Sequence, residues 1–216
     1  MQVNKIDNTA FTSRRQTIRF ADDIARKSHI LYDTVSGSRL ACYKNYKQFE
    51  YLRDCIFMRT SFMRKMKDKL YNCADNFYKK IEALINPTRL YKVANCGEQS
   101  HIASIMAKVN GIKNCHIAHL YKSNGKDLDH AVVYVNDEKP YIIDGWLGFA
   151  DYVPNALKRY QKEYKQFFDI EQGDSIGFAS KYDDEFTDLL KDNFTKKQIK
   201  TIKRLYPEMK IVKNKK

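Results

Sequence analysis

Apolar positions recur at helical spacing through the first part of the chain. Residues 13–86 include the tracts RRQTIRFADDIARKSHILY and YKQFEYLRDCIFMRTSFMRKMKDKLYNCADNFYKKIEALI, and the second tract lacks proline and glycine. This pattern predicts two or more packed helices. Pro87 is expected to close them, because the residue before a proline is pushed out of helical geometry. The aromatic residues interleaved with bases are interpreted as core side chains, rather than as a stacking surface for single-stranded nucleic acid.

Beyond Pro87 the pattern predicts one helix and then three strands. Residues 96–109 have one buried stripe at helical spacing, and Asn110-Gly111 supplies a left-handed stop. The stripe consists of Ile102, Ile105, Met106 and Val109. Residues 115–122, 130–136 and 140–144 are short and rich in β-branched and aromatic side chains, which predicts antiparallel strands.

The last part of the chain, from Asp151, returns to a helical pattern. We expect a helix over 153–168, a glycine-containing loop over 171–180, and helices in DDEFTDLLKDNF and TKKQIKTIKRLY. The fold class is therefore α+β: a helix packed on a small antiparallel sheet, with N- and C-terminal helical extensions. We expect a helical N-terminal region over 1–88 and a core with C-terminal helices over 89–216, packed as one compact unit.

Composition indicates which classes of partner the protein binds and in which compartment it is made. The 216 residues include 39 Lys+Arg against 26 Asp+Glu, a net charge of +13, which favours anionic partners such as an acidic protein surface. Lysine dominates the C-terminal tract, whereas base reading usually recruits arginine, so nucleic acid is not the expected partner. Five scattered cysteines argue against a disulfide framework. The sequence shows no membrane span and no signal peptide, which predicts synthesis in the cytoplasm.

Cys96 is the candidate nucleophile, within VANCGEQSHIASIMA. Asn95 is a good N-cap residue and Glu98 completes a capping box, which places Cys96 at the positive end of a helix, where the thiolate is favoured. Gly97 leaves the backbone bare, so a substrate carbonyl can approach the Cys96 amide as one half of an oxyanion hole. Asn95 and Gln99 are the candidates for the second donor, and each is equally explained as a cap or a surface amide.

His130 and Asp144 are the candidate base and its orienting carboxylate. His130 opens one predicted strand and Asp144 ends the next, so both lie at the same end of a hairpin. If residues 136 and 140 pair across a three-residue loop, Asp144 lies opposite Val132 and diagonal to His130 on the same face. A two-residue loop would separate them. Asp151 is the alternative acid, while Asp129 is expected in the loop.

These residues resemble the papain-like and transglutaminase-like thiol enzymes. NCGE, followed by DHAVVYV and YIIDGW, looks most like bacterial effector and toxin domains of this group, which include cysteine proteases and glutamine deamidases. The resemblance covers about residues 93–150. It implies Cys96 as nucleophile, His130 as base and acid, and Asp144 as orienter, and it implies delivery into a host cell. Papain has a glutamine six residues before its cysteine, where this chain has Leu90.

The sequence thus predicts a cysteine-dependent amide hydrolase, a protease or a glutamine deamidase, that acts on a protein. A transglutaminase or acyltransferase with the same triad, and a non-enzymatic basic adaptor for nucleic acid or anionic surfaces, remain alternatives. Trp146 is expected to wall the substrate cleft or only to pack the sheet. No cofactor is predicted. No metal site is predicted either, because Cys115, His116 and His119 lie in a strand without a second ligand pair.

Overall fold

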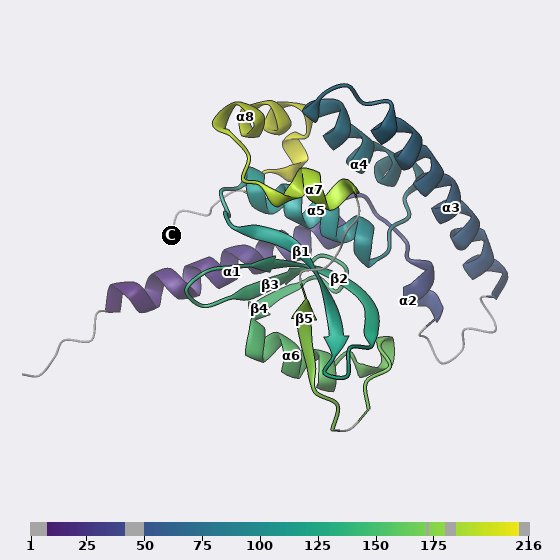
Figure 1. The fold of residues 1–216 in the computed structure, drawn as a ribbon. Coiled ribbons are helices and arrows are strands. Elements are labelled where there is room, and N and C mark those ends of the chain that lie inside the picture. The colour runs from purple at the N-terminus through teal and green to yellow at the C-terminus, as the bar shows by residue number, and fades with distance from the viewer. Residues whose placement is uncertain (1–7, 42–49, 172, 180–184, 212–216) are drawn as a thin grey trace, which may run out of the picture.

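The computed structural model describes residues 8–41, 50–171, 173–179 and 185–211, which fold into α-helices around a five-stranded antiparallel sheet (Figure 1). The strand order is β4-β3-β2-β1-β5. The helices are α1 (Asn8–Ile30), α2 (Gly37–Ala41), α3 (Glu50–Asn72), α4 (Phe77–Tyr91), α5 (Cys96–Val109), α6 (Val153–Lys162), α7 (Glu185–Lys191) and α8 (Lys196–Leu205), with short 3-10 turns η2 (Lys165–Phe167) and η3 (Pro207–Met209). The strands are β1 (Cys115–Lys122), β2 (Asp127–Val135), β3 (Tyr141–Asp144), β4 (Phe149–Tyr152) and β5 (Ile176–Ala179). The predicted α+β class is confirmed.

Each face of the sheet is buried by a different set of helices. Val133 and Ile143 pack into a core with residues of α1, α4, α5 and α8. On the other face, Val132 and Ile142 pack with Ala156 and Tyr160 of α6. Because successive side chains of a strand point to opposite faces, β2 supplies both cores. Residues at even positions near His130 therefore face α6.

Helix α5 lies at the centre of the molecule. Its predicted bounds are confirmed, and Gly111 takes the left-handed backbone (φ 94°) that stops the helix. The expectation of a single buried stripe is wrong, because every residue from Glu98 to Val109 is buried. Contacts with α1, α4, α7, α8 and the sheet surround this helix on all sides (Figure 1).

The N-terminal helices contain one further correction. Pro87 does not close the helical part but lies buried inside α4, which continues to Tyr91. A proline in a helix interior costs about 3 kcal/mol, and the burial of Ile81, Leu84 and Ile85 in the core offsets it. A boundary at residue 88 would therefore fall inside α4. The long predicted helical tract that precedes Pro87 does form two helices, α3 and α4. They are separated at Asn76, which caps α4 by accepting the amides of residues 78 and 79.

The predicted helix after Asp151 is also corrected. Residues 149–152 form β4, and α6 ends at Lys162 rather than at residue 168. The predicted loop over 171–180 contains β5, which pairs with β1 through Leu120 and Phe178. Four-residue strands are too short to show a clear alternation, and neighbouring β1 and β3 supply the pairing that defines them.

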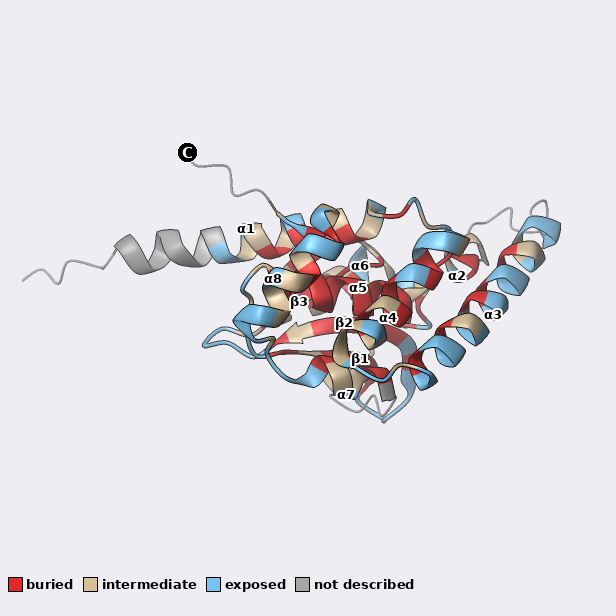
Figure 2. Ribbon diagram, turned by 90° about the horizontal axis from the view of Figure 1, so that it is seen from above, coloured by how far each residue is buried: buried red, intermediate tan, exposed pale blue. Residues whose placement is uncertain are grey.

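Helix α3 extends along one side of the fold with much of its surface exposed (Figure 2). Tyr51 is 84% exposed, Phe62 59% and Phe57 42%, so the interpretation of the N-terminal aromatics as core residues is wrong for these three. Tyr71, at the other end of α3, is buried as expected. None of the helices among the described residues has both the length and the apolar character that a bilayer crossing requires.

Candidate functional site

The hairpin register brings His130 and Asp144 together. Val135 pairs with Tyr141 and Val133 with Ile143, which corresponds to a three-residue loop and places Asp144 one step further, opposite Val132. Earlier in β2, between residues 127 and 131, an irregularity in the pairing with β1 inserts two extra residues. Asp129 has a left-handed backbone (φ 51°) at this irregularity and is exposed, within β2 rather than in the expected loop. The local kink directs the buried His130 toward Asp144.

His130 and Asp144 form a buried pair. His130 Nε2 lies 2.7 Å from Asp144 Oδ2, and the side chains are 1% and 0% exposed. Burial opposes a charged ring, but the charge of Asp144, its hydrogen bond and the Cys96 thiol outweigh burial and raise the pKa of His130 above 6.5. Burial likewise opposes ionisation of Asp144, yet the contact with His130 lowers the pKa of Asp144 below 3.8. Imidazolium and carboxylate therefore form an ion pair at neutral pH.

Asp144 is held by hydrogen bonds on both oxygens. Its Oδ1 accepts the backbone amides of Trp146 at 3.0 Å and Leu147 at 2.8 Å, while its Oδ2 accepts the Tyr160 hydroxyl at 2.6 Å in addition to His130. Burial and the charge of Asp144 raise the pKa of Tyr160 well above 10.0, so the hydroxyl stays protonated and donates. The carboxylate is thus fixed in one orientation.

Cys96 lies at the tip of α5 and contacts both cores of the sheet. Its side chain is half-buried, and the thiol lies 3.5 Å from the Asp129 carbonyl, to which it donates. His130 Nδ1 makes no hydrogen bond of standard geometry with a described residue. Since Asp144 occupies Nε2 and the thiol acts on the ring from hydrogen-bonding range, Nδ1 is the nitrogen left for Cys96. The three predicted triad residues meet at one place.

Two contacts hold the tip of α5 against the hairpin. Ser100 Oγ donates to the Ala131 carbonyl at 2.7 Å, next to His130 in the chain. A Cβ at Gly145 would lie 2.9 Å from the Gln99 carbonyl, so only glycine lets the turn after Asp144 approach α5 this closely. These contacts set the spacing between the nucleophile and the base.

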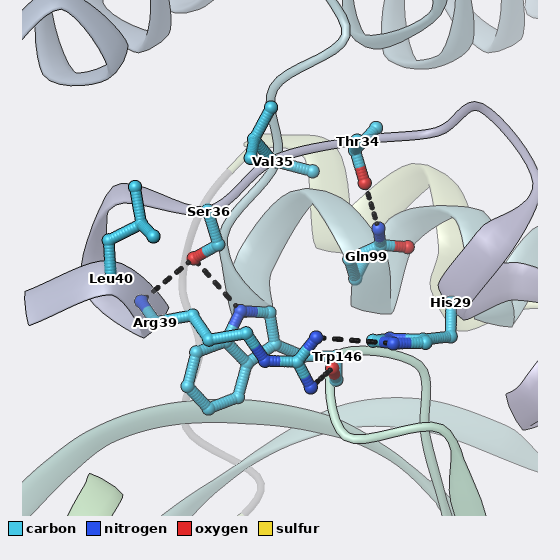
Figure 3. Close-up of a pocket in the computed structure, with 9 residues that line it drawn as sticks. His29, Thr34, Val35, Ser36, Arg39, Leu40, Gln99 and Trp146 are labelled. Carbon is cyan, nitrogen blue, oxygen red and sulfur yellow. Dashed lines mark hydrogen bonds between the residues drawn. The ribbon is translucent and has the colours of Figure 1, made fainter. Parts of the chain in front are cut away.

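The capping residues of α5 distinguish the two candidate oxyanion donors. Glu98 accepts the Asn95 backbone amide at 3.0 Å and pairs with Arg64 at 2.8 Å. Asn95 Oδ1 accepts the Ser36 hydroxyl at 2.8 Å, which leaves its Nδ2 without a hydrogen bond among the described residues. Gln99, by contrast, uses its Nε2 to donate to Thr34 at 2.7 Å (Figure 3). Asn95 therefore has both of its N–H donors available among the described residues, whereas Gln99 has already used one.

Gly97 and Trp146 have different surroundings. A Cβ built at Gly97 would meet nothing within 4 Å, so the backbone beside Cys96 faces open space. Trp146 is 5% exposed, with its ring centroid 5.5 Å from that of His130 and its Nε1 donating to Ser36. It also lines a pocket of about 190 Å³ with Gln99 and Arg39 (Figure 3). Trp146 thus shields the imidazole and borders a pocket beside the triad.

Three functional side chains were missed by sequence reasoning. Tyr160 donates a hydrogen bond to Asp144. The Phe168 ring lies 4.7 Å from the His130 ring, measured between centroids. Ser36 donates a hydrogen bond to Asn95. Tyr160 and Phe168 belong to a tract interpreted only as an amphipathic helix, and Ser36 lies in a short tract without periodicity. No local signal in the sequence links them to residues 95, 130 and 144.

The remaining candidates lie away from the triad. The Asp151 carboxylate accepts the backbone amide of Tyr152 and the side chain of Asn155. Cys115 is buried in the core and His119 lies 3.3 Å from Asp127. Within the described ranges, no three His, Cys, Asp or Glu side chains gather as a metal ion would require.

No family model matches the chain, and no curated protein or solved structure matches it significantly.

Tyr160→Phe tests the bond to Asp144. A hydrogen bond to a charged group is worth about 1.5–3 kcal/mol, so we expect the free energy of unfolding in urea to fall by roughly this amount. Asp144 would keep three of its partners and therefore its position. Tyr134→Phe is the matched control, because Tyr134 packs on Phe178 as Tyr160 does and its hydroxyl makes no hydrogen bond with a described residue. An equal loss in both variants would contradict the assignment.

Proposed function

We propose that the protein is a cysteine-dependent amide hydrolase of papain-like design, which acts on a protein through Cys96, His130 and Asp144. The observation that supports it best is the buried His130–Asp144 pair, whose free imidazole nitrogen is left for a half-buried thiol at a helix N-terminus. A nucleophile, its base and the orienter of that base are what acyl transfer requires.

Each side chain has a role in the proposed mechanism. Protonated His130, stabilised by Asp144, balances the Cys96 thiolate, which attacks the amide carbonyl. The Cys96 backbone amide and Asn95 Nδ2 donate to the oxygen that becomes negative. His130 then gives its proton to the departing amine or ammonia, and water activated by the neutral imidazole hydrolyses the thioester. Transfer to another amine in place of water would give transglutamination or acyl transfer.

The reaction itself is tested by mass spectrometry of proteins incubated with the enzyme. We expect either a new chain terminus, from peptide cleavage, or conversion of Gln to Glu, and neither product with Cys96→Ala. Cys73→Ala, which removes an exposed thiol elsewhere, is the control and should retain activity. Products that persist in Cys96→Ala would refute a thiol mechanism.

Asn95 and Gln99 are distinguished by comparing two reactions of Cys96. Acylation by a p-nitrophenyl ester develops an oxyanion, whereas alkylation by iodoacetamide does not. Removing an oxyanion donor costs about 10²–10³ in rate, so Asn95→Ser, which keeps a capping oxygen, should slow acylation by about that factor and leave alkylation nearly unchanged. Gln99→Ala should affect acylation much less, because its amide donates to Thr34. The reverse order of effects would make Gln99 the donor.

A further inference from the structure

A concave basic surface lies on α8 and on the segment after η3. It is an open, shallow concavity of about 530 Å³, and we call it the α8 basic pocket. Its lining consists of one apolar and five cationic side chains: Ile199, Lys196, Lys200, Lys203, Arg204 and Lys210.

The helical period places these cations together. Lys196, Lys200 and Lys203 follow each other at spacings of four and three, so they share one face of α8. Ile202 lies on the opposite face and is fully buried in the main core. The apolar face of α8 is therefore already used inside the fold, and the basic face is what the helix presents to solvent.

The positive charge of this pocket is not compensated by the described residues. None of the five cationic groups has a carboxylate oxygen within 4.0 Å in that part of the chain, and the first turn of α8 contains no acid. Lys27 of α1 adds another ammonium, which donates to the Lys210 carbonyl at 2.6 Å. Glu208, the nearest acid in the chain, lies by Tyr32 and Arg89 instead. Lys196, in the first turn of α8, also opposes the helix dipole, whereas Lys203 and Arg204 lie in the last turn, where the dipole favours cations.

We propose that the α8 basic pocket binds a small, multiply phosphorylated anion. Such a ligand would relieve the mutual repulsion of the cations and the conflict of Lys196 with the helix dipole. Lysine ammonium groups bind phosphate as point charges and need no planar bidentate geometry. A cluster of four to eight basic residues on an amphipathic helix is the pattern that recognises phosphorylated lipid headgroups. The five cations are gathered on one short helix and the turn that follows it, so a small polyanion can contact them together.

The pocket is separate from the proposed catalytic site. Asn110, just after α5, donates to the Met209 carbonyl and accepts the amide of Ile211. This end of α5 thus lies beside the segment that carries Lys210, while Cys96 begins the helix at its other end. The 14 residues of α5, at about 1.5 Å each, put the two ends about 20 Å apart. Binding here does not depend on the thiol chemistry.

Calorimetric titration with inorganic tripolyphosphate tests the proposal. We expect tripolyphosphate to bind more tightly than orthophosphate, and Lys196→Ala/Lys200→Ala to weaken its binding about tenfold, as expected for the loss of two surface charge contacts. Lys158→Ala/Lys162→Ala removes the same charge at the same spacing from exposed positions of α6 and should stay within about twofold. Equal weakening in both variants, or no binding by the unmodified protein, would overturn the proposal.

Vesicle sedimentation distinguishes a lipid headgroup from a free anion. Phosphatidylcholine vesicles with phosphatidylinositol bisphosphate are compared with phosphatidylserine vesicles of equal total charge. Binding to the first alone, competed by tripolyphosphate, would identify a headgroup as the source. Binding to neither, with tripolyphosphate still bound in solution, would identify a free polyphosphate. Equal binding to both without competition would contradict a phosphate-specific pocket, because diffuse charge attraction would then explain it.

Discussion

Asp144→Ala is expected to lower the free energy of unfolding by about 3–5 kcal/mol, the usual cost of removing one partner of a buried ion pair. The variant leaves His130, 1% exposed, without the carboxylate that stabilises its proton. Tyr160 and the amides of residues 146 and 147 would also lose their acceptor. Urea unfolding followed by circular dichroism measures the loss.

The pH dependence of this loss follows from the two pKa shifts. The lowered pKa of Asp144 gives stability that is present above 3.8 and is lost as the pH falls through the folded-state value. The raised pKa of His130 gives stability that is complete below 6.5 and is lost as the pH rises through its folded-state value. The difference in the free energy of unfolding between Asp144→Ala and the unmodified protein should therefore be largest between 3.8 and 6.5, where both contributions are present. Asp144→Asn keeps the shape of the side chain and should cost less than Asp144→Ala, and a loss that does not vary with pH would contradict the ion pair.

His130→Ala is expected to slow alkylation of Cys96 by iodoacetamide by about 10²-fold at mildly acidic pH, the lower range for loss of a positioned acid–base group. The raised pKa of His130 keeps the ring protonated there, and in the proposed mechanism this imidazolium stabilises the thiolate that reacts. Removing the ring leaves a neutral thiol whose reaction requires higher pH. Mass spectrometry of the labelled peptides gives the rate.

Cys73, which is exposed and remote from the triad, provides a control within the same molecule. His116→Ala, which removes a different histidine, in β1 rather than β2, controls for the loss of an imidazole. His130→Ala should leave the alkylation rate of Cys73 nearly unchanged. His116→Ala should leave the alkylation rate of Cys96 nearly unchanged. An unchanged Cys96 rate in His130→Ala would show that the imidazole does not act on the sulfur.

Local sequence signals sufficed to predict the elements that carry the triad. The capping pattern of Asn95 and Glu98 located the start of α5, and the β-branched and aromatic content of 115–122 located β1, both with the bounds the structure has. Whether His130 and Asp144 share a face of the sheet could be predicted only conditionally, because it depended on the length of the turn between β2 and β3. The observed register confirms the three-residue alternative.

Elements that depend on distant contacts were not predictable in the same way. Pro87 lies inside a helix because core burial outweighs its local preference, and four-residue β5 is defined by its partner β1. Tyr160 reaches Asp144 only because α6 crosses the far face of the sheet. The free Nδ2 of Asn95 likewise depends on Ser36, 59 positions away in the chain. Such tertiary partners have no local sequence signal.

The most direct test of the proposed function is the ratio of alkylation rates of Cys96 and Cys73 in the unmodified protein, measured from acidic to alkaline pH. A thiolate paired with a buried imidazolium predicts that Cys96 reacts faster than Cys73 and that the ratio of the two rates is largest at acidic pH. If Cys96 reacts no faster than Cys73 at any pH, its sulfur is not the activated nucleophile and the proposed enzyme mechanism is wrong.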